Sequence, residues 1–261
     1  MSKPTPQLDP NATPFYPSTP LASFPVACIN ARSLRNKSAE LSDFLTTSCP
    51  LVVCITETWL CPQISLSFPG YECFRRDRPT SENKINTNDF LAYGGVAILV
   101  KSSAFGPITH RTDLHLPQFE ATWVEISPST GTSACPTRQQ PIQIAAVYRP
   151  PSTDPSVIDN FYASFQSCLT KIRTPGSPVL IMGDFNAKCS TWYGTTTDTA
   201  GHHLSCLLDM FALQQHVTFS THRSHKGNEA ALDLMITDTA ASICDPRPSA
   251  PLGQSDPSIV L

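Results

Sequence analysis

Short apolar segments recur along this 261-residue chain, and they constrain its fold more than any other feature. Each is 4 to 8 residues long and rich in Val, Ile and Leu, which is typical of strands buried on both faces. In chain order they are FPVACI, CPLVVCIT, GGVAILV, ATWVEI, PIQIAAVY, SPVLIMG, ALDLMIT and SIVL. Amphipathic patterns of helical length lie between some of them, at 38–46, 157–172 and 203–214. The alternation predicts an α/β fold with more strand than helix.

The composition is that of a globular protein, with 40% hydrophobic and 15% charged residues. A formal net charge of -3 gives no overall basic field, although a protein that carries its own metal ion can approach phosphates without one. No segment approaches the roughly 20 apolar residues that span a bilayer, and the N-terminus lacks the pattern of a secretory signal. We therefore expect a soluble, intracellular protein, in the nucleus or cytoplasm, without a membrane partner.

The ten cysteines include no CxxC pair, and Cys28 and Cys54 lie inside apolar strand-like segments. A free thiol in such a segment behaves as a small hydrophobe. In an intracellular protein this pattern predicts reduced cysteines and no disulfide-linked partner.

Three polar regions interrupt the pattern of strands and helices. Residues 1–21 are rich in Pro, Ser and Thr and show no periodicity, so we expect a disordered leader before a single domain at 22–261. Residues 75–90 and 128–141 are predicted to be surface loops.

Polar side chains follow several of the predicted strands. Asn30 follows FPVACI, Glu57 follows the next strand, Tyr148 ends PIQIAAVY, and Asp184 and Asn186 follow VLIMG. Functional groups collect at such strand ends, because the core holds the strand while the loop is free to vary. Together they predict an oxygen-rich pocket suited to Mg²⁺ or Mn²⁺. Taken singly, each is also typical of a solvated loop residue, a helix cap or a half-buried tyrosine.

Seven blocks occur in a familiar order from about residue 24 to the end: NARSL, ITETWL, GGVAILV, VYRPP, GDFNA, LDLMIT and GQSDPSIVL. They resemble the endonuclease/exonuclease/phosphatase superfamily, and specifically the apurinic-endonuclease-like domain of non-LTR (LINE-type, jockey/CR1-like) retrotransposon polyproteins. The resemblance implies a four-layer α/β sandwich of two packed mixed sheets flanked by helices. It also implies a Mg²⁺-dependent phosphodiesterase that nicks target-site duplex DNA.

Carried over position by position, the resemblance gives the polar residues at the strand ends catalytic and metal-binding roles. The catalytic residues would be Asp184, Asn186, Tyr148, Asp233 and Asp256. The metal would be held by Glu57, Asn30 and Asp256. In these roles Asp184 orients and deprotonates the attacking water, Asn186 fixes Asp184, and Tyr148 contacts the phosphate. Asp233 would orient a catalytic histidine.

That histidine is missing from its expected position. Where the family has Ser-Asp-His, this chain has Ser255-Asp256-Pro257. Proline has no side-chain donor, and a general acid/base contributes roughly 10² to 10⁴ in rate, so we expect impaired activity. Proline is tolerated at the first residue of a strand, so the fold is expected to persist. His222 and His225 are the nearby substitutes in sequence, but loop histidines in a polar stretch are more often solvated.

Basic residues in the predicted loops are candidates for phosphate contacts, which supply most nonspecific DNA affinity. They are Arg32, Arg35, Arg75, Arg76, Arg78, Arg149, His222, Arg223 and Lys226. The same residues are also typical of solvated surface charge.

Three functions remain open. The first is a DNA-nicking endonuclease module without the reverse transcriptase that follows it in intact elements, since this chain stops at Leu261. The second is a catalytically inactive DNA-binding remnant, which Pro257 favours. The third is a small-molecule phosphatase of the same superfamily, which the NARSL, ITETWL and VYRPP blocks disfavour.

Overall fold

The computed structural model describes residues 24–79, 93–127, 140–172, 177–223, 227–238, 246–253 and 259–261. The predicted leader at 1–21, most of the two predicted loops, and Lys226, Asp256 and Pro257 lie outside these residues.

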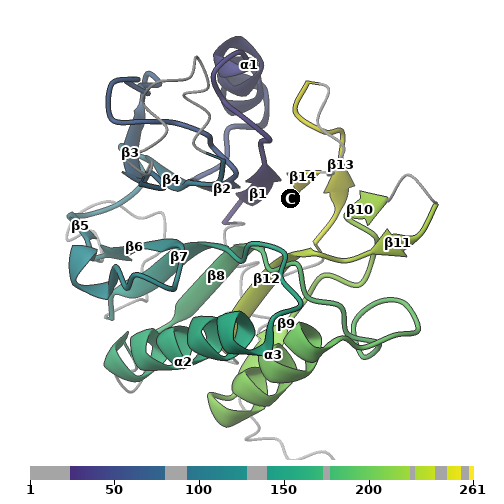
Figure 1. The fold of residues 1–261 in the computed structure, drawn as a ribbon. Coiled ribbons are helices and arrows are strands. Elements are labelled where there is room, and N and C mark those ends of the chain that lie inside the picture. The colour runs from purple at the N-terminus through teal and green to yellow at the C-terminus, as the bar shows by residue number, and fades with distance from the viewer. Residues whose placement is uncertain are drawn as a thin grey trace, which may run out of the picture.

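Two six-stranded sheets form the centre of the described fold (Figure 1). The strands of the first are β1 (Val26–Asn30), β2 (Val52–Thr56), β3 (Tyr71–Arg76), β4 (Val96–Lys101), β13 (Pro248–Ser249) and β14 (Ile259–Val260), in the spatial order β13-β14-β1-β2-β4-β3. Those of the second are β5 (Ile108–His110), β6 (Ala121–Ile126), β7 (Ile142–Tyr148), β8 (Val179–Asp184), β9 (Leu213–Gln215) and β12 (Asp233–Asp238), in the order β5-β6-β7-β8-β12-β9. A hairpin of β10 (His222–Arg223) and β11 (Glu229–Ala230) stands apart from both sheets, and a 3-10 turn, η2, spans Thr112–Leu114.

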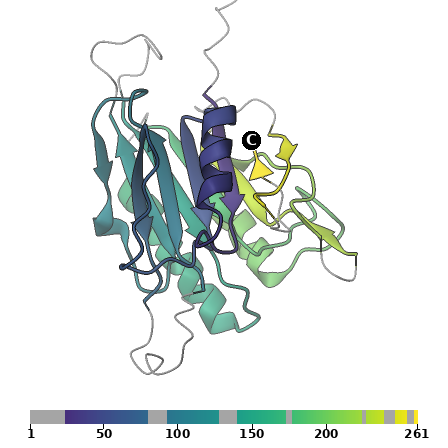
Figure 2. The ribbon, with the colours of Figure 1, turned by 90° about the horizontal axis from the view of Figure 1, so that it is seen from above.

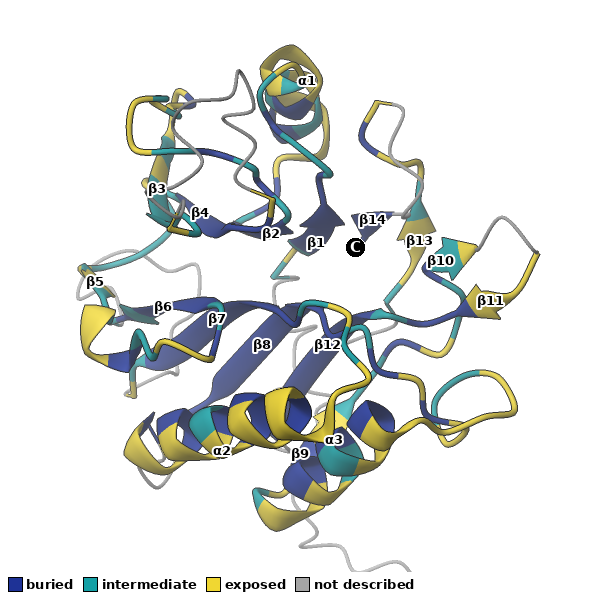
Figure 3. Ribbon diagram, viewed as in Figure 1, coloured by how far each residue is buried: buried dark blue, intermediate teal, exposed yellow. Residues whose placement is uncertain are grey.

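Helices cover the outer faces of both sheets, which gives four layers. The helix α1 (Ser38–Ser48) lies on the first sheet, and α2 (Pro155–Ile172) and α3 (Thr199–Met210) lie on the second (Figures 1 and 2). The central strands β1, β2, β4, β7, β8 and β12 are buried almost throughout, while the helices bury one side each (Figure 3). The predicted four-layer α/β sandwich is therefore confirmed. None of the described helices is both long and apolar enough to cross a membrane.

Local sequence signals explain two of the helices. At α2, Asp154 Oδ1 accepts a hydrogen bond from the Ser156 backbone N–H (2.9 Å), which caps the helix ahead of its apolar face. At α3 the prediction of 203–214 was wrong at both ends. The helix begins at Thr199, because Asp198 accepts from the Gly201 N–H (2.7 Å), and it ends at Met210. The backbone then turns at Ala212 (φ 50°) so that β9 can pair with β12.

The prediction of a loop at 75–90 was also wrong at its start. Arg75 and Arg76 are the last residues of β3 and pair with Ala97 and Val96 of β4. The alternation in this strand is weak because most of its residues are only half-buried, so its polar side chains resemble those of a loop.

The topology brings four strand ends together. The strands β1 and β2 are parallel, as are β7 and β8, and the registers place Tyr148 beside Asp184. The antiparallel β12 begins with Asp233 opposite Asp184. Because β1 packs against β8 and β12, the ends of both parallel pairs meet between the sheets. Gly183 permits this geometry, since its φ is 152° and a Cβ there would lie 1.9 Å from the Val147 oxygen.

Candidate active site

A cavity of about 220 Å³ lies where these strand ends meet. Its lining residues come from both sheets and from the hairpin: Asn30, Arg32, Glu57, Tyr148, Pro151, Asp184, Asn186, His222, Leu232 and Asp233. This cavity thus brings together all the described residues to which the family resemblance assigned a catalytic or metal-binding role.

Asn30 joins the two sheets at the centre of this cavity. Its Nδ2 donates to Asp184 Oδ2 (2.9 Å) and to Glu57 Oε1 (3.2 Å). Asn30 is only 4% exposed, and its amide holds two carboxylates at fixed positions on opposite sheets. Hydrogen bonds to carboxylates are roughly twice as strong as neutral ones, so this bridge fixes the cavity walls.

The loop after β8 fixes Asp184 from its other side. The backbone N–H of Asn186 donates to Asp184 Oδ1 (2.9 Å), and the Asn186 side chain donates to the Arg149 carbonyl (2.8 Å). Burial raises the pKa of Asp184 to about 7, and the negative charge of Glu57 adds to the rise. The hydrogen bonds from Asn186 and Asn30 oppose it without cancelling it. A carboxyl with such a pKa is suited to proton transfer at neutral pH.

Asp233 is a second buried acid, 1% exposed. Its backbone N–H and that of Leu232 both donate to Thr221 Oγ1 (3.0 Å each). Burial raises the pKa of the Asp233 carboxyl, and the neighbouring Asp184 charge raises it further. Its Oδ1 has no hydrogen-bond partner among the described residues. An acid held in this way requires a donor or a cation to complete its surroundings.

The donor chemistry of the cavity fits a hard divalent cation. Three carboxylates and two amides line it, and both the raised pKa of Asp184 and the unpartnered Asp233 oxygen indicate missing positive charge. Within the part of the chain that the structure describes, no three His, Cys, Asp or Glu side chains form a ready metal cage. Mg²⁺ needs only one or two carboxylates, because water and phosphate oxygens complete its shell. Glu57 and Asn30 would hold it from the described residues.

Tyr148 lines the cavity, and its ring contacts Arg78, which forms an ion pair with Glu120. The Arg78 guanidinium lies 5.5 Å from the Tyr148 ring centroid, within cation–π range. Glu120 accepts from Arg78 Nε (2.9 Å) and from the Gly95 backbone N–H. Burial raises the pKa of Tyr148, so its hydroxyl stays protonated and can donate. Glu120 was not predicted from the sequence, because it precedes its strand, and it lies beside the other strand-end residues only because β6 runs antiparallel to β7.

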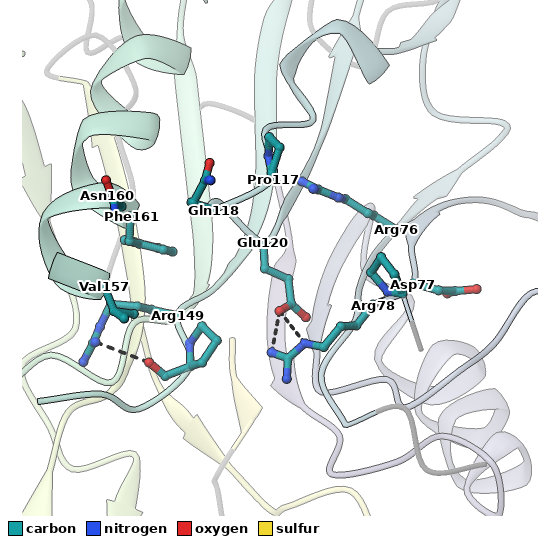
Figure 4. Close-up of a pocket in the computed structure, with 12 residues that line it drawn as sticks. Arg76, Asp77, Arg78, Pro117, Gln118, Glu120, Arg149, Val157, Asn160 and Phe161 are labelled. Carbon is teal, nitrogen blue, oxygen red and sulfur yellow. Dashed lines mark hydrogen bonds and ion pairs between the residues drawn. The ribbon is translucent and has the colours of Figure 1, made fainter. Parts of the chain in front are cut away.

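Arg78 and Glu120 also line a second cavity of about 360 Å³, together with Arg149 and Pro150. Figure 4 shows their ion pair at its edge, with Arg149 and Phe161 on the opposite wall. Its surface is largely apolar, and it contains none of the strand-end acids at 57, 184 and 233.

Several arginines predicted to contact DNA instead hold the backbone. The Arg149 side chain is 3% exposed and donates to the carbonyls of Phe185, Pro150 and Asn186, so its guanidinium is buried. Arg76 donates to the carbonyls of Phe119, Ala121 and Leu116, and Arg75 to those of Ile64 and Cys61. Buried carbonyls need such donors, and nothing in the local sequence distinguishes this use of arginine from phosphate binding.

Two of the remaining basic candidates line the cavity. Arg32 and His222 line it, Arg35 donates to the Trp59 carbonyl (2.9 Å), and Arg223 is exposed on the hairpin. His222 was expected to be a solvated loop residue, but it lies in β10 and is half-buried.

Comparison with known proteins supports the family indicated by the sequence. Residues 142–260 match the family model described as endonuclease-reverse transcriptase. No curated protein shows significant sequence similarity to the chain.

Solved structures with the same fold cover almost the whole chain. The endonuclease domain of TRAS1, a telomere-specific non-LTR retrotransposon, is 18% identical over 91% of this chain and 96% of its own, with a TM-score of 0.69. The AP endonuclease LMAP from Leishmania major is 15% identical over 91% and 86%, with a TM-score of 0.68. The 3′ phosphatase NExo from Neisseria, bound to a product DNA hairpin, is 16% identical over 91% and 98%, with a TM-score of 0.63. The resemblance is thereby confirmed: the chain has the endonuclease/exonuclease/phosphatase fold, and its residues 142–260 match the endonuclease-reverse transcriptase family.

Proposed function

We propose that this chain is a Mg²⁺-dependent phosphodiesterase that nicks duplex DNA, the endonuclease module of a non-LTR retrotransposon. The observation that carries the proposal is the Asn30 bridge between Glu57 and Asp184 inside one cavity. A purely structural role would not require two acids from different sheets to share one amide in a partly enclosed space. The similarity to retrotransposon and AP endonuclease folds supports the same reaction class.

The chemistry of phosphodiester cleavage explains this arrangement. In-line attack needs a positioned water, positive charge against the phosphoryl oxygens and a stabilised leaving oxygen. Asp184, whose pKa of about 7 matches neutral solution, accepts the proton of the attacking water. Asn30 and Asn186 keep its two oxygens in place, and the Tyr148 hydroxyl donates to the phosphate. A bound Mg²⁺ or Mn²⁺ supplies the positive charge.

We propose DNA as the partner, and the nucleus or cytoplasm as the location. Arg32 and Arg35 follow β1 beside the cavity, and Arg223 projects from the hairpin. We assign them to phosphate contacts, together with Lys226, which lies outside the described residues. These contacts would give most of the nonspecific affinity and a strong dependence on salt.

A second candidate function is DNA binding without catalysis, and the observation that favours it is Pro257. The family histidine would stand there, and proline supplies neither a donor nor an acceptor from its side chain. In this alternative the cavity still binds the metal and the phosphate, but the protein cleaves DNA slowly or not at all.

Nicking of supercoiled plasmid distinguishes the two functions. The first predicts Mg²⁺-dependent conversion to open circles that EDTA abolishes and that Asp184→Ala reduces at least 10²-fold. Asp43→Ala is the matched control, because Asp43 is an exposed acid on α1. Pro257→His tests the missing group directly and should raise the rate. If neither the native chain nor this variant nicks DNA with Mg²⁺ or Mn²⁺, the proposed endonuclease function is refuted.

A further inference from the structure

Arg78 connects an ion pair to the strand-end cavity. Its Nε donates to Glu120 Oε2 (2.9 Å), and its guanidinium carbon lies 5.5 Å from the centroid of the Tyr148 ring, within cation–π range. Figure 4 shows the guanidinium turned toward the Glu120 carboxylate. Arg78 lines the second cavity and not the strand-end cavity, so it contacts the proposed active site through the Tyr148 ring.

Glu120 holds both this arginine and the backbone of Tyr148. Its carboxylate accepts from Nε and Nη2 of Arg78 and from the Gly95 backbone N–H, and its side chain is 14% exposed. Its carbonyl accepts from the Tyr148 N–H (2.9 Å). An arginine that donates twice to a carboxylate is held in orientation as well as in place. Glu120 therefore fixes the cation relative to the ring beneath it.

Gly94 lets the ion pair lie close to the strand ends. A Cβ at this position would lie 2.5 Å from Arg78 Cζ, so the guanidinium packs against the backbone in the space that a side chain would fill. The Gly94 carbonyl also accepts from the Trp59 N–H (2.8 Å), in the loop that follows Glu57. The ion pair is therefore part of the framework that holds the strand ends together.

The Arg78 charge suits the role proposed for the Tyr148 hydroxyl. Burial raises the pKa of Tyr148, the charges of Glu57 and Asp184 raise it further, and the Arg78 charge opposes the rise. Carboxylates near a phenol disfavour negative charge on its oxygen and so weaken it as a donor, whereas a nearby cation has the opposite effect. A donor that is already fixed also needs no reorganisation during the reaction. Both requirements are met by a cation that is held against the ring.

We propose that Arg78 is a positioning residue of the active site: held by Glu120, its guanidinium fixes the Tyr148 ring so that the hydroxyl donates to a phosphoryl oxygen of the DNA. This inference rests on the proposed endonuclease function. It gives Arg78 a role different from that of the basic residues assigned to phosphate contacts, since its effect reaches the DNA through Tyr148.

A double-mutant cycle between positions 78 and 148 tests this inference in plasmid nicking. Tyr148→Phe removes the donor and should lower kcat by about 10². Arg78→Met leaves the donor misplaced and should lower kcat by about tenfold or more. In the Tyr148→Phe background Arg78→Met should cost less than about twofold, because no hydroxyl remains to be positioned. If only the Pro257→His variant nicks DNA, the cycle is carried out in that variant.

Two further variants control for charge and folding. Arg78→Lys keeps a cation but not the two-donor contact with Glu120, so it should lose less activity than Arg78→Met. It replaces Arg78→Met in the cycle if the methionine variant does not fold. Arg111→Met is the matched control and should keep the native kcat, since Arg111 also pairs with two acids but lines neither cavity.

A spectroscopic measurement detects the positioning without catalysis. With 3-fluorotyrosine placed at position 148, the ¹⁹F resonance should shift in Arg78→Met and stay unchanged in Arg111→Met. Thermal unfolding of the same proteins shows whether a shift reflects loss of the fold.

The possible results separate this inference from the function on which it rests. An equal loss of kcat in both backgrounds, an unchanged Arg78→Met enzyme or an unmoved ¹⁹F resonance would overturn the inference while the endonuclease function stands. A salt slope of DNA binding that falls by about one at constant kcat would also overturn it, because Arg78 would then contact phosphate directly. If neither the native chain nor Pro257→His nicks DNA, the function fails and the inference fails with it.

Discussion

Replacing Asp184 with Asn should stabilise the metal-free protein at pH 8, although it removes the proposed catalytic base. The buried carboxyl has a pKa of about 7 instead of its ordinary 3.8, so the folded protein binds more protons than the unfolded chain between these values. Its ionisation therefore costs stability as the pH rises, up to about 4 kcal/mol above pH 7. An amide does not ionise and so avoids this cost. It places an NH₂ group against the Asn30 donor, however, and this lost hydrogen bond lowers the free energy of unfolding by about 1–2 kcal/mol.

The net gain should be about 2 kcal/mol, or about 4–8 °C in Tm for a domain of this size. Urea unfolding in EDTA at pH 5, 6, 7 and 8 measures it. The free energy of unfolding of the native chain should rise as the pH falls from 8 to 5, while that of Asp184→Asn should change less. The exposed Asp43→Asn control should follow the native chain. An Asp184→Asn protein that is less stable than the native chain at pH 8 would show that the carboxylate is not destabilising and that our reasoning about its burial is wrong.

Two further predictions concern residues that hold the cavity walls. Arg149→Ala should lower the free energy of unfolding by about 3 kcal/mol, because it leaves buried carbonyls without donors. The control Arg223→Ala, at an exposed arginine, should change it by less than about 0.5 kcal/mol. Equal denaturant midpoints for the two variants would contradict the structural role of Arg149. Gly183→Ala should destabilise the protein by more than about 3 kcal/mol or prevent folding, since the added Cβ would lie 1.9 Å from the Val147 oxygen. A native-like circular dichroism spectrum with an unchanged denaturant midpoint would contradict this prediction.

The buried strands could be predicted from the sequence because their signal is local. A run such as VLIMG in β8 has few alternatives to a doubly buried strand, and the residue that follows it, Asp184, is then placed at a strand end by counting alone. Which strand ends meet is not local. It depends on the packing of β1 against β8 and β12. The strand-end residues predicted a polar pocket, but only the resemblance to known blocks added Asp233 and assigned a role to each residue.

The errors have physical causes that the sequence does not display. The helical spacing of Leu204, Leu207, Leu208 and Phe211 runs past the last helical residue, because Phe211 is the C-cap of α3, and Leu213 is already the buried first residue of β9. An arginine in a sequence can either contact phosphate or donate hydrogen bonds to buried backbone carbonyls. Only the fold shows that Arg149 donates to carbonyls. The prediction for His222 was wrong in the opposite direction, since its polar neighbours suggested a solvated loop while the residue lies half-buried in β10 and lines the cavity.

Backbone strain supports the assignment of the cavity independently of its side-chain chemistry. Glu57 (φ 51°), Asn186 (φ 43°) and Arg32 (φ 42°) all adopt positive φ without being glycine. Each conformation costs of order 1–3 kcal/mol and persists only where the surroundings enforce it. All three follow strands that end at the same cavity, and all three line it. Ser33, Cys49, Trp59 and Ala212 also have positive φ but do not line it, so strain marks this cavity because three such residues converge there, and not because strain occurs only there.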